Sequence, residues 1–304
     1  MEPGLPNMNS APAIGPEKLH ERFQLHDGRR LGFAEYGEPG AKAILYFHGW
    51  PSSRLEARVM RRAIAEMGLR VIAPDRPGYG LSDLKPGRAI GDWAQDAEAL
   101  ADHLNLARFA VLGISGGGPY AVACAAKLSA RVTQALLVCS MGPTDSPEST
   151  QGMVGLNRFL LSFARSTPWL AQRLAGFCLR VLWGTGDQVI PEQIESCLPQ
   201  RDQQTLADPE LRRVLTESSR EGLRPGVEGA AWDGLLFSRP WGFDLREIRV
   251  PVRLWHGEKD VVVPVSMGHF LAKNIPGCQA RFYEEDGHFS LPFSRMREIL
   301  AALV

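Results

Sequence analysis

The sequence predicts an α/β fold in which a mostly parallel sheet of eight strands carries helices on both faces. Two observations support this prediction. Short apolar segments alternate with amphipathic helical segments over residues 43–140, an order typical of parallel βα units. The same alternation returns from residue 252 to the C-terminus, after a long interruption rich in helical and aromatic segments.

The expected elements follow one another closely along the chain. Two strands at residues 22–26 and 30–36 flank Asp27-Gly28, a dipeptide that favours a hairpin turn. The other strands are expected at residues 43–47, 71–73, 109–112, 132–139, 252–256 and 280–283, and helices at residues 54–67, 90–104, 120–128, 265–274 and 292–303.

Four regions are predicted from composition. Residues 1–18 form a disordered tail, and residues 19–140 form the first part of the core. A helical cap, or lid, at residues 141–245 is inserted after the sixth strand, and residues 246–304 complete the core. The cap is expected to contain helices at residues 156–165 and 194–198, and to cover an apolar pocket.

The composition excludes several classes of function. Among 304 residues, Lys+Arg and Asp+Glu both number 34, so neither nucleic acid nor a membrane is an expected partner. Five cysteines without a C-x-x-C pair favour reduced thiols in a cytoplasmic protein, and no metal or organic cofactor is implied. No segment resembles a signal peptide or a membrane span. We expect a monomer or a homodimer that acts on a small-molecule substrate.

Residues 109–119 predict a buried strand, a sharp turn and the start of a helix. Gly113 and Gly117 flank Ser115 in the pattern G-x-S-x-G. A strand that turns directly into a helix strains the middle residue and leaves room only for glycine on either side. The hydroxyl of Ser115 would then stand over a helix N-terminus, which favours negative charge. A glycine-rich loop that merely caps a helix is the alternative, but the strand–turn–helix–strand context favours a nucleophile.

A serine nucleophile needs a base and a group that orients the base. Functional groups of open α/β sheets gather where strands end, and Asp260 and His288 follow the last two predicted strands. The chain order serine, acid, histidine is the one expected for this architecture. Glu258 and Asp145 are the alternatives for the acid. The other six histidines are expected to be structural or on the surface: His20, His26, His48, His103, His256 and His269.

The developing oxyanion needs two N–H donors. Gly116 supplies one at the start of the helix, and we expect the second from the backbone of Trp50, in the loop after the third strand. The indole of Trp50 would line the substrate pocket. The further candidates for that pocket are His48, Trp183, Trp232 and Phe289.

These signatures together resemble the α/β-hydrolase superfamily, in its serine-triad branch with a helical cap. The resemblance runs from about residue 22 to the C-terminus and rests on HGWP at 48–51, DRPGYGLS at 75–82, the turn around Ser115, Asp260 and Gly287-His288. It implies a cis Trp50–Pro51 bond. Epoxide hydrolases and haloalkane dehalogenases look similar but use an aspartate nucleophile, so Ser115 argues against both. The HGWP loop is also similar to that of cofactor-free haloperoxidases.

The expected function is therefore a serine hydrolase that cleaves small to medium, largely apolar carboxylic esters through an acyl-enzyme. Three alternatives stay open. One is an aminopeptidase-like amide or peptide hydrolase, which would need cap carboxylates to hold a substrate amine, and the sequence offers Glu192, Glu217, Glu221 and Glu228. The others are a cofactor-free perhydrolase (haloperoxidase) and a ligand-sensing protein of the same fold.

Overall fold

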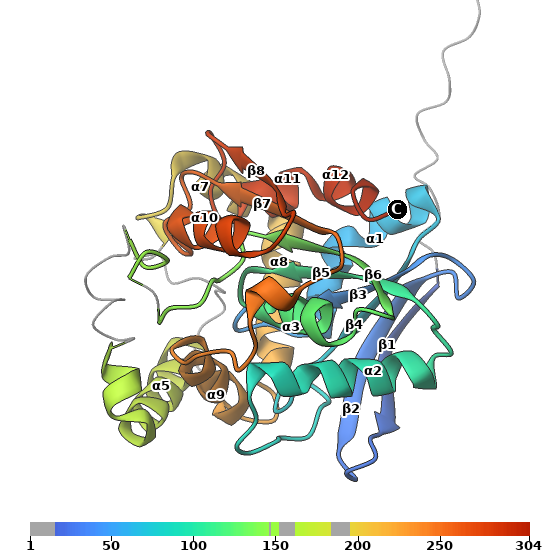
Figure 1. Ribbon diagram of the computed structural model, residues 1–304, viewed down its shortest axis with the longest axis horizontal. Coiled ribbons are helices and arrows are strands. Elements are labelled where there is room, and N and C mark those ends of the chain that lie inside the picture. The colour runs from blue at the N-terminus through green and yellow to red at the C-terminus, as the bar shows by residue number, and fades with distance from the viewer. Residues whose placement is uncertain (1–15, 146, 152–161, 184–194) are drawn as a thin grey trace, which may run out of the picture.

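A single sheet of eight strands organises the molecule (Figure 1). The computed structural model describes residues 16–145, 147–151, 162–183 and 195–304. Within these residues the strand order is β1-β2-β4-β3-β5-β6-β7-β8. The bounds are Glu17–Gln24 (β1), Arg30–Gly37 (β2), Ala43–Phe47 (β3), Arg70–Pro74 (β4), Phe109–Ile114 (β5), Val132–Val138 (β6), Val252–Gly257 (β7) and Gln279–Tyr283 (β8).

The predicted mostly parallel arrangement is confirmed. Strand β2 is antiparallel to β1 and to β4, and every other pair of neighbours is parallel. All six residues of the central strand β5 are buried, because helices cover both faces of the sheet. Successive side chains alternate between the two cores, so that Val111 joins one and Leu112 the other.

The helices of the core divide between the two faces. Helices α2, α3 and α10 contribute to the core that contains Val111, and α1, α11 and α12 to the core that contains Leu112 (Figure 1). Their bounds are Arg61–Met67 (α1), Trp93–His103 (α2), Gly118–Lys127 (α3), Val265–Asn274 (α10), Ser290–Ser294 (α11) and Met296–Ala301 (α12). None of the helices in the described ranges has the length and apolar character that a membrane span requires.

The stretch between β6 and β7 carries helices instead of βα units. They are α5 (Pro168–Trp183), α7 (Gln200–Leu206), α8 (Pro209–Gly222) and α9 (Glu228–Phe237), followed by the short 3-10 helix η4 (Leu245–Glu247). Helix α5 lies beside α9 (Figure 1), and α8 lies against the 3-10 helix η1 (Arg54–Met60). We call this stretch the insertion. That residues 141–245 form a separate cap domain stays a prediction.

Several element bounds differ from the prediction. Strand β1 begins at Glu17, inside the predicted tail. The predicted final helix is broken at Arg295, which leaves the helical conformation and whose guanidinium binds Asp286 at 3.0 Å. The helix predicted at 156–165 lies mostly outside the described residues. The described part of the stretch 194–198 is one helical residue and a turn rather than a helix.

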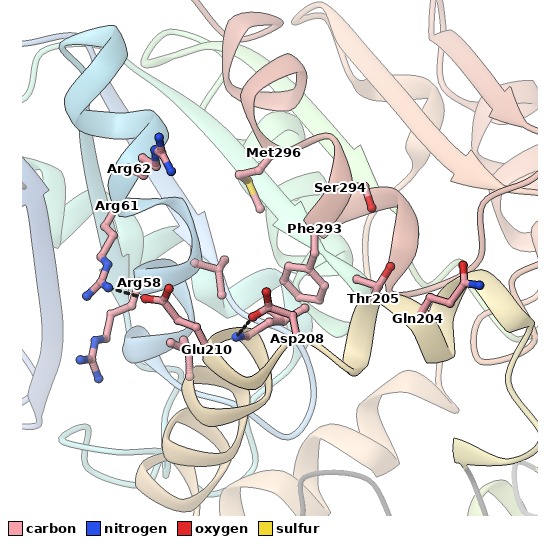
Figure 2. A pocket seen from close by; sticks show the side chains of 13 residues that line it. Arg58, Arg61, Arg62, Gln204, Thr205, Asp208, Glu210, Phe293, Ser294 and Met296 are labelled. Atoms are coloured by element: carbon pink, nitrogen blue, oxygen red, sulfur yellow. Dashed lines mark hydrogen bonds and ion pairs between the residues drawn. The ribbon is translucent and has the colours of Figure 1, made fainter. Parts of the chain in front are cut away.

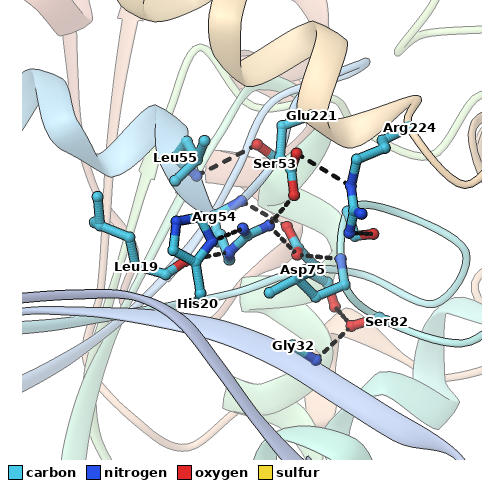
Figure 3. A network of polar contacts seen from close by, with 12 residues as sticks. Leu19, His20, Gly32, Ser53, Arg54, Leu55, Asp75, Ser82, Glu221 and Arg224 are labelled. Atoms are coloured by element: carbon cyan, nitrogen blue, oxygen red, sulfur yellow. Dashed lines mark hydrogen bonds and ion pairs between the residues drawn. The ribbon is translucent and has the colours of Figure 1, made fainter.

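A buried ion pair fixes the loop after β4 against the start of η1 (Figure 3). Arg54 and Asp75 are both fully buried, with Arg54 Nη1 2.8 Å from Asp75 Oδ2. The same carboxylate accepts the N–H of Leu81 at 2.8 Å, and Arg54 also binds Glu221 of α8 at 2.8 Å. One arginine therefore joins the core, the loop after β4 and the insertion.

Candidate active site

Ser115 occupies a strained turn between β5 and α3. Its φ is +54°, in the left-handed region that L-residues with a Cβ rarely adopt. A Cβ on Gly113 would lie 2.7 Å from the carbonyl oxygen of Gly117, and one on Gly117 would lie 2.0 Å from that of Phe47. The contacts explain why both positions hold glycine, and the turn has the geometry that the G-x-S-x-G pattern predicts.

The structure brings Ser115, His288 and Asp260 together. His288 Nε2 lies 3.0 Å from Ser115 Oγ, and His288 Nδ1 lies 2.8 Å from Asp260 Oδ2. The other oxygen of Asp260 accepts the N–H groups of Val262 and Val263 at 2.9 and 2.7 Å. The carboxylate is thus fixed by the backbone and aimed at the imidazole.

Electrostatics around this pair favour a charged carboxylate on Asp260 and make the imidazole of His288 more basic. Burial raises the pKa of Asp260, but the His288 charge and the hydrogen bonds from His256 and His288 outweigh it and hold this pKa far below its usual value. Burial lowers the pKa of His288, but the charge and hydrogen bond of Asp260 outweigh burial and raise it above the usual value. The arrangement stabilises a proton on His288 whenever the imidazole takes one.

Asp202, which sequence reasoning missed, holds the loop that carries His288. It lies on α7 in the insertion and is fully buried. Its two oxygens accept the N–H of His288 at 2.9 Å, that of Ser290 at 2.8 Å and the Ser290 hydroxyl at 2.7 Å. With the N–H of Phe289 at 3.2 Å, four donors bind this one carboxylate and fix the loop. No local sequence signal marks Asp202, because its partners lie 86 to 88 positions away along the chain.

The two predicted oxyanion donors lie next to each other. A Cβ built on Gly116 would lie 2.8 Å from Trp50 Cβ and 3.4 Å from the Trp50 backbone nitrogen. Gly116 belongs to the 3-10 turn Ser115–Gly117 that leads into α3, so its N–H lies among the free donors at a helix start. The Trp50–Pro51 bond is cis, as the resemblance implies. The indole of Trp50 reaches the insertion, where Nε1 donates to the carbonyl of Ala230 at 2.8 Å.

An apolar pocket of about 330 Å³ borders this arrangement, between the core and helices α5 and α9. Its lining includes Trp50, Met141, Phe163, Leu174, Leu235 and Met267. The N–H of Met141 donates to the Ser115 carbonyl at 3.2 Å, so the pocket adjoins the serine. No charged side chain lines it within the part of the chain that the structure describes.

Of the predicted pocket residues whose side chains the structure describes, Trp50 lines this space, and His48, Trp232 and Phe289 lie elsewhere. His48 is fully buried, and its Nδ1 pairs with the Gly49 carbonyl at 2.9 Å, so it shapes its own loop. Trp232 donates to the Arg88 carbonyl at 3.0 Å and packs on the core. Phe289 packs against the cluster of Leu198, Leu206 and Leu215. The side chain of Trp183 lies outside the described part.

Neither alternative acid has the buried position of Asp260. Asp145 and Glu258 are both exposed, whereas Asp260 is buried at hydrogen-bond distance from His288. The structure therefore favours Asp260 as the partner of His288.

A second pocket, of about 510 Å³, lies between η1, α8 and α11 (Figure 2). Three arginines line it, and each has a carboxylate partner. Arg58 pairs with Glu217 at 2.6 Å, Arg62 with Glu66 at 3.1 Å, and Arg61 with Glu210. No histidine is among the lining residues that the structure describes. Ser115, Asp260 and His288 are not among the described residues that line this pocket, so it is separate from the site around Ser115.

One group of potential metal ligands stands together in the described residues. Atoms of Cys139, Asp260 and His288 lie within 4.8 Å of one another. Asp260 and His288 are already bonded to each other. Burial and the charge of Asp260 raise the pKa of the Cys139 thiol well above its usual value, so it stays protonated and is a poor ligand.

The insertion carboxylates that could hold a substrate amine are engaged elsewhere. Glu217 pairs with Arg58 and Arg213, Glu221 pairs with Arg54, and Glu228 pairs with Arg180. Glu192 lies outside the described residues.

Comparisons with known proteins match nearly the whole chain. The sequence profile of the alpha/beta hydrolase fold matches residues 42–294. The chain is 29% identical over 249 residues to the non-heme chloroperoxidase of Burkholderia pyrrocinia, which covers 79% of this chain and 82% of that protein. It is 24% identical over 301 residues to the Homo sapiens monoacylglycerol lipase ABHD6, and the alignment covers 94% of this chain and 81% of that protein. An esterase structure from Exiguobacterium antarcticum shares the fold, with a TM-score of 0.65 and 20% identity. The match covers 93% of this chain and 98% of the esterase.

Proposed function

Because the chain belongs to the alpha/beta hydrolase fold family, we propose that it is a serine hydrolase that cleaves small to medium, largely apolar carboxylic esters through an acyl-enzyme. One observation carries the proposal. Ser115, His288 and Asp260 form a continuous chain of hydrogen bonds, of 3.0 and 2.8 Å, beside an apolar pocket. This is the arrangement that activates a serine hydroxyl.

In the first half of the reaction, Ser115 Oγ attacks the ester carbonyl while His288 Nε2 takes the hydroxyl proton. Asp260 keeps the Nδ1 proton in place and stabilises the imidazolium. The N–H groups of Gly116 and Trp50 bind the oxyanion that develops on the carbonyl oxygen. His288 then gives its proton to the departing alcohol, and the acyl group remains on Ser115.

In the second half, His288 takes a proton from water, and the hydroxide formed attacks the acyl-enzyme. The tetrahedral intermediate uses the same two N–H donors. Its collapse returns the proton from His288 to Ser115 Oγ and releases the carboxylic acid. No further group is needed for atoms and charges to balance.

The pocket supports an apolar substrate. A lining without charged side chains in the described residues favours hydrocarbon over ionic groups, because an ion would lose its hydration there without a partner. The engagement of Glu217, Glu221 and Glu228 with arginines argues against an aminopeptidase-like reaction, which needs a free carboxylate for the substrate amine.

The test is active-site labelling with a fluorophosphonate, combined with a panel of p-nitrophenyl esters graded by acyl length. We expect stoichiometric labelling at Ser115 and ester hydrolysis that the Ser115→Ala variant lacks. Ester hydrolysis that survives Ser115→Ala would contradict the proposal. Ligand-induced stabilisation with negligible turnover of every ester would indicate a ligand-sensing protein instead.

The similarity to a protein named non-heme chloroperoxidase supports perhydrolysis as a second candidate function. Hydrogen peroxide would replace water in the second half of the reaction, so that attack on the acyl-enzyme releases a peracid. The peracid would oxidise a halide in solution. Peroxide-dependent bromination of monochlorodimedone in acetate buffer, abolished by Ser115→Ala, is the expected result, and its absence would exclude this candidate.

A further inference from the structure

We propose that Arg76, locked by Asp233 of helix α9, is a positioning residue that turns the N–H of Trp50 toward the oxyanion. The inference rests on the proposed function, because it concerns the second donor of that reaction. It also makes the docking of α9 on the core a condition for an effective oxyanion site.

The guanidinium of Arg76 holds three acceptors at once. Nε donates to Asp233 Oδ2 at 2.7 Å, Nη2 donates to the carbonyl of Gly49 at 2.9 Å, and Nη1 donates to the carbonyl of His48. The side chain is fully buried. Because the guanidinium is planar and its donors have fixed directions, these bonds set the orientation of both carbonyls together.

The direction of the Trp50 N–H follows from the Gly49 carbonyl. The two groups belong to one peptide unit, and this unit is trans, since the cis bond at Trp50 is the one to Pro51. In a trans peptide the C=O and the N–H point to opposite sides. The Gly49 carbonyl points at Arg76, so the Trp50 N–H faces away from Arg76. Gly116 lies close to it, since a Cβ built there would be 3.4 Å from the Trp50 nitrogen.

The neighbouring donor in the loop is already used. The N–H of Gly49 donates to both oxygens of Glu56, at 3.1 and 3.2 Å. His48 provides a second hydrogen bond to the Gly49 carbonyl, because its Nδ1 lies 2.9 Å from the Gly49 oxygen. Burial and the charge of Arg76 hold the pKa of His48 well below its usual value, so the ring is neutral and Nδ1 is its donor. The loop thus leaves the Trp50 N–H for the oxyanion.

Arg76 is itself held on all sides. The rings of Tyr79 and Tyr120 lie over the guanidinium, with centroids 4.9 and 5.0 Å from its carbon. The hydroxyls of both tyrosines donate to Asp233, at 2.8 and 2.6 Å. Arg88 provides a second positive charge to the same carboxylate. Both oxygens of Asp233, and the three guanidinium nitrogens of Arg76, therefore have hydrogen-bond partners.

Helix α9 holds the 48–50 loop in two ways, through Arg76 and through the indole of Trp50. Asp233 binds Arg76, and the Ala230 carbonyl, one turn earlier, binds the indole of Trp50. If α9 moves away, Arg76 loses its carboxylate and the Gly49 carbonyl loses a fixed donor. The Gly49–Trp50 peptide can then rotate and place its carbonyl oxygen where the oxyanion must form. Repulsion between the two oxygens would destabilise the oxyanion.

The test compares Arg76→Met with the matched control Arg88→Met. Both remove a buried guanidinium from Asp233, but Arg88 contacts Tyr120 and the Gly229 carbonyl rather than the 48–50 loop. With a p-nitrophenyl ester, we expect Arg76→Met to lower kcat about 100-fold at nearly unchanged KM, the loss typical of a missing oxyanion donor. The pH midpoint of kcat should stay that of the wild type, since His288 is not touched. Arg88→Met should lower kcat by about threefold or less.

Equal kcat losses in Arg76→Met and Arg88→Met would overturn the inference, because Arg76 would then only anchor α9. Should Arg76→Met fail to fold, Arg76→Lys replaces it. Lysine keeps the charge opposite Asp233 but cannot bind both carbonyls, so the same loss is expected, and wild-type kcat would overturn the inference. Ser115→Ala is measured in parallel. If that variant keeps wild-type activity the proposed function fails, whereas if it is inactive and Arg76→Met matches Arg88→Met only this inference fails.

Discussion

His288 Nε2 lies 3.0 Å from Ser115 Oγ, although 173 positions separate the two residues along the chain. Ser115 stands at the end of β5, and His288 follows β8, three places away in the sheet. The two side chains meet because the carboxyl ends of parallel strands share one edge. This contact therefore depends on the sheet topology, and the proposed chemistry depends on this contact.

The backbone at Ser115 stores strain that a glycine would release. Its φ of +54° costs an L-residue about 1–2 kcal/mol, but costs glycine little. We expect the free energy of unfolding of Ser115→Gly to exceed that of Ser115→Ala by about 1 kcal/mol. Urea denaturation measures this difference as a higher midpoint for the glycine variant. Both variants lack the hydroxyl, so their difference isolates the backbone. A more stable alanine variant would contradict a strained turn.

The pH dependence of ester hydrolysis should report His288. Its pKa is raised, because Asp260 outweighs burial, and only the neutral imidazole can accept the proton of Ser115. We expect kcat/KM to rise with pH through a midpoint above about 6.5, the ordinary value for histidine.

Asp260→Asn removes the charge that raises the pKa of His288 while burial remains. The midpoint of kcat/KM should therefore move to lower pH, and kcat should fall by about 10⁴, since an amide cannot hold the productive tautomer. The measurement is the pH profile of both proteins on one ester, and an unchanged midpoint would assign the titration to another group.

The apolar pocket should set the length of the acyl chain. Ala171 of α5 lines it, and Ala171→Phe would fill part of its volume of about 330 Å³. We expect the optimum on a graded ester panel to move to shorter acyl chains, with about a tenfold loss or more in kcat/KM for each methylene that no longer fits. Ala301→Phe, at an exposed position of α12, is the control and should keep the wild-type optimum. The same optimum in both variants would place the acyl chain elsewhere.

The buried pair of Arg54 and Asp75 should dominate the stability of the loop after β4. Arg54→Met leaves a carboxylate that is fully buried without its cation, at an expected cost of about 3–5 kcal/mol in the free energy of unfolding. Burial already raises the pKa of Asp75 despite Arg54, and losing the arginine raises it further. The cost should therefore shrink as the pH falls from 7 toward 5 and the carboxyl group becomes neutral.

The double variant Arg54→Met/Asp75→Asn separates charge from packing. It should be more stable than Arg54→Met alone at pH 7, because the uncompensated charge is gone. Urea denaturation of the three proteins at both pH values gives the comparison. A double variant less stable than the single one would show that the hydrogen bonds of Asp75, rather than its charge, hold the loop.

Much of the fold could be predicted because its signals are local. The strands lie near their predicted positions, α10 has the predicted bounds, and the chemistry-bearing residues Ser115, Asp260 and His288 stand at predicted strand ends. The final helix was predicted as one element because nothing in its sequence breaks the helical pattern. It ends at Ser294 because Arg295 leaves the helical conformation and binds Asp286, a tertiary contact.

The surroundings of the site were less predictable. Trp232 was an expected pocket residue, but its indole packs on the core and binds the Arg88 carbonyl. Asp202 and Asp233 had no expected role, although each is fully buried at the site. Arg76 stood inside a recognised motif without a role, since its partners lie 27 to 157 positions away.

The sequence by itself determined the order of strands and helices, the strained turn at Ser115 and the residues that follow each strand. These depend on periodicity and on glycine spacing, which act over a few positions of the chain. Only the tertiary structure decided which insertion carboxylates hold the loops of the candidate active site and which side chains line the pocket. Those choices depend on the directions of side chains on packed helices, and such directions follow from contacts between segments that are distant in the sequence.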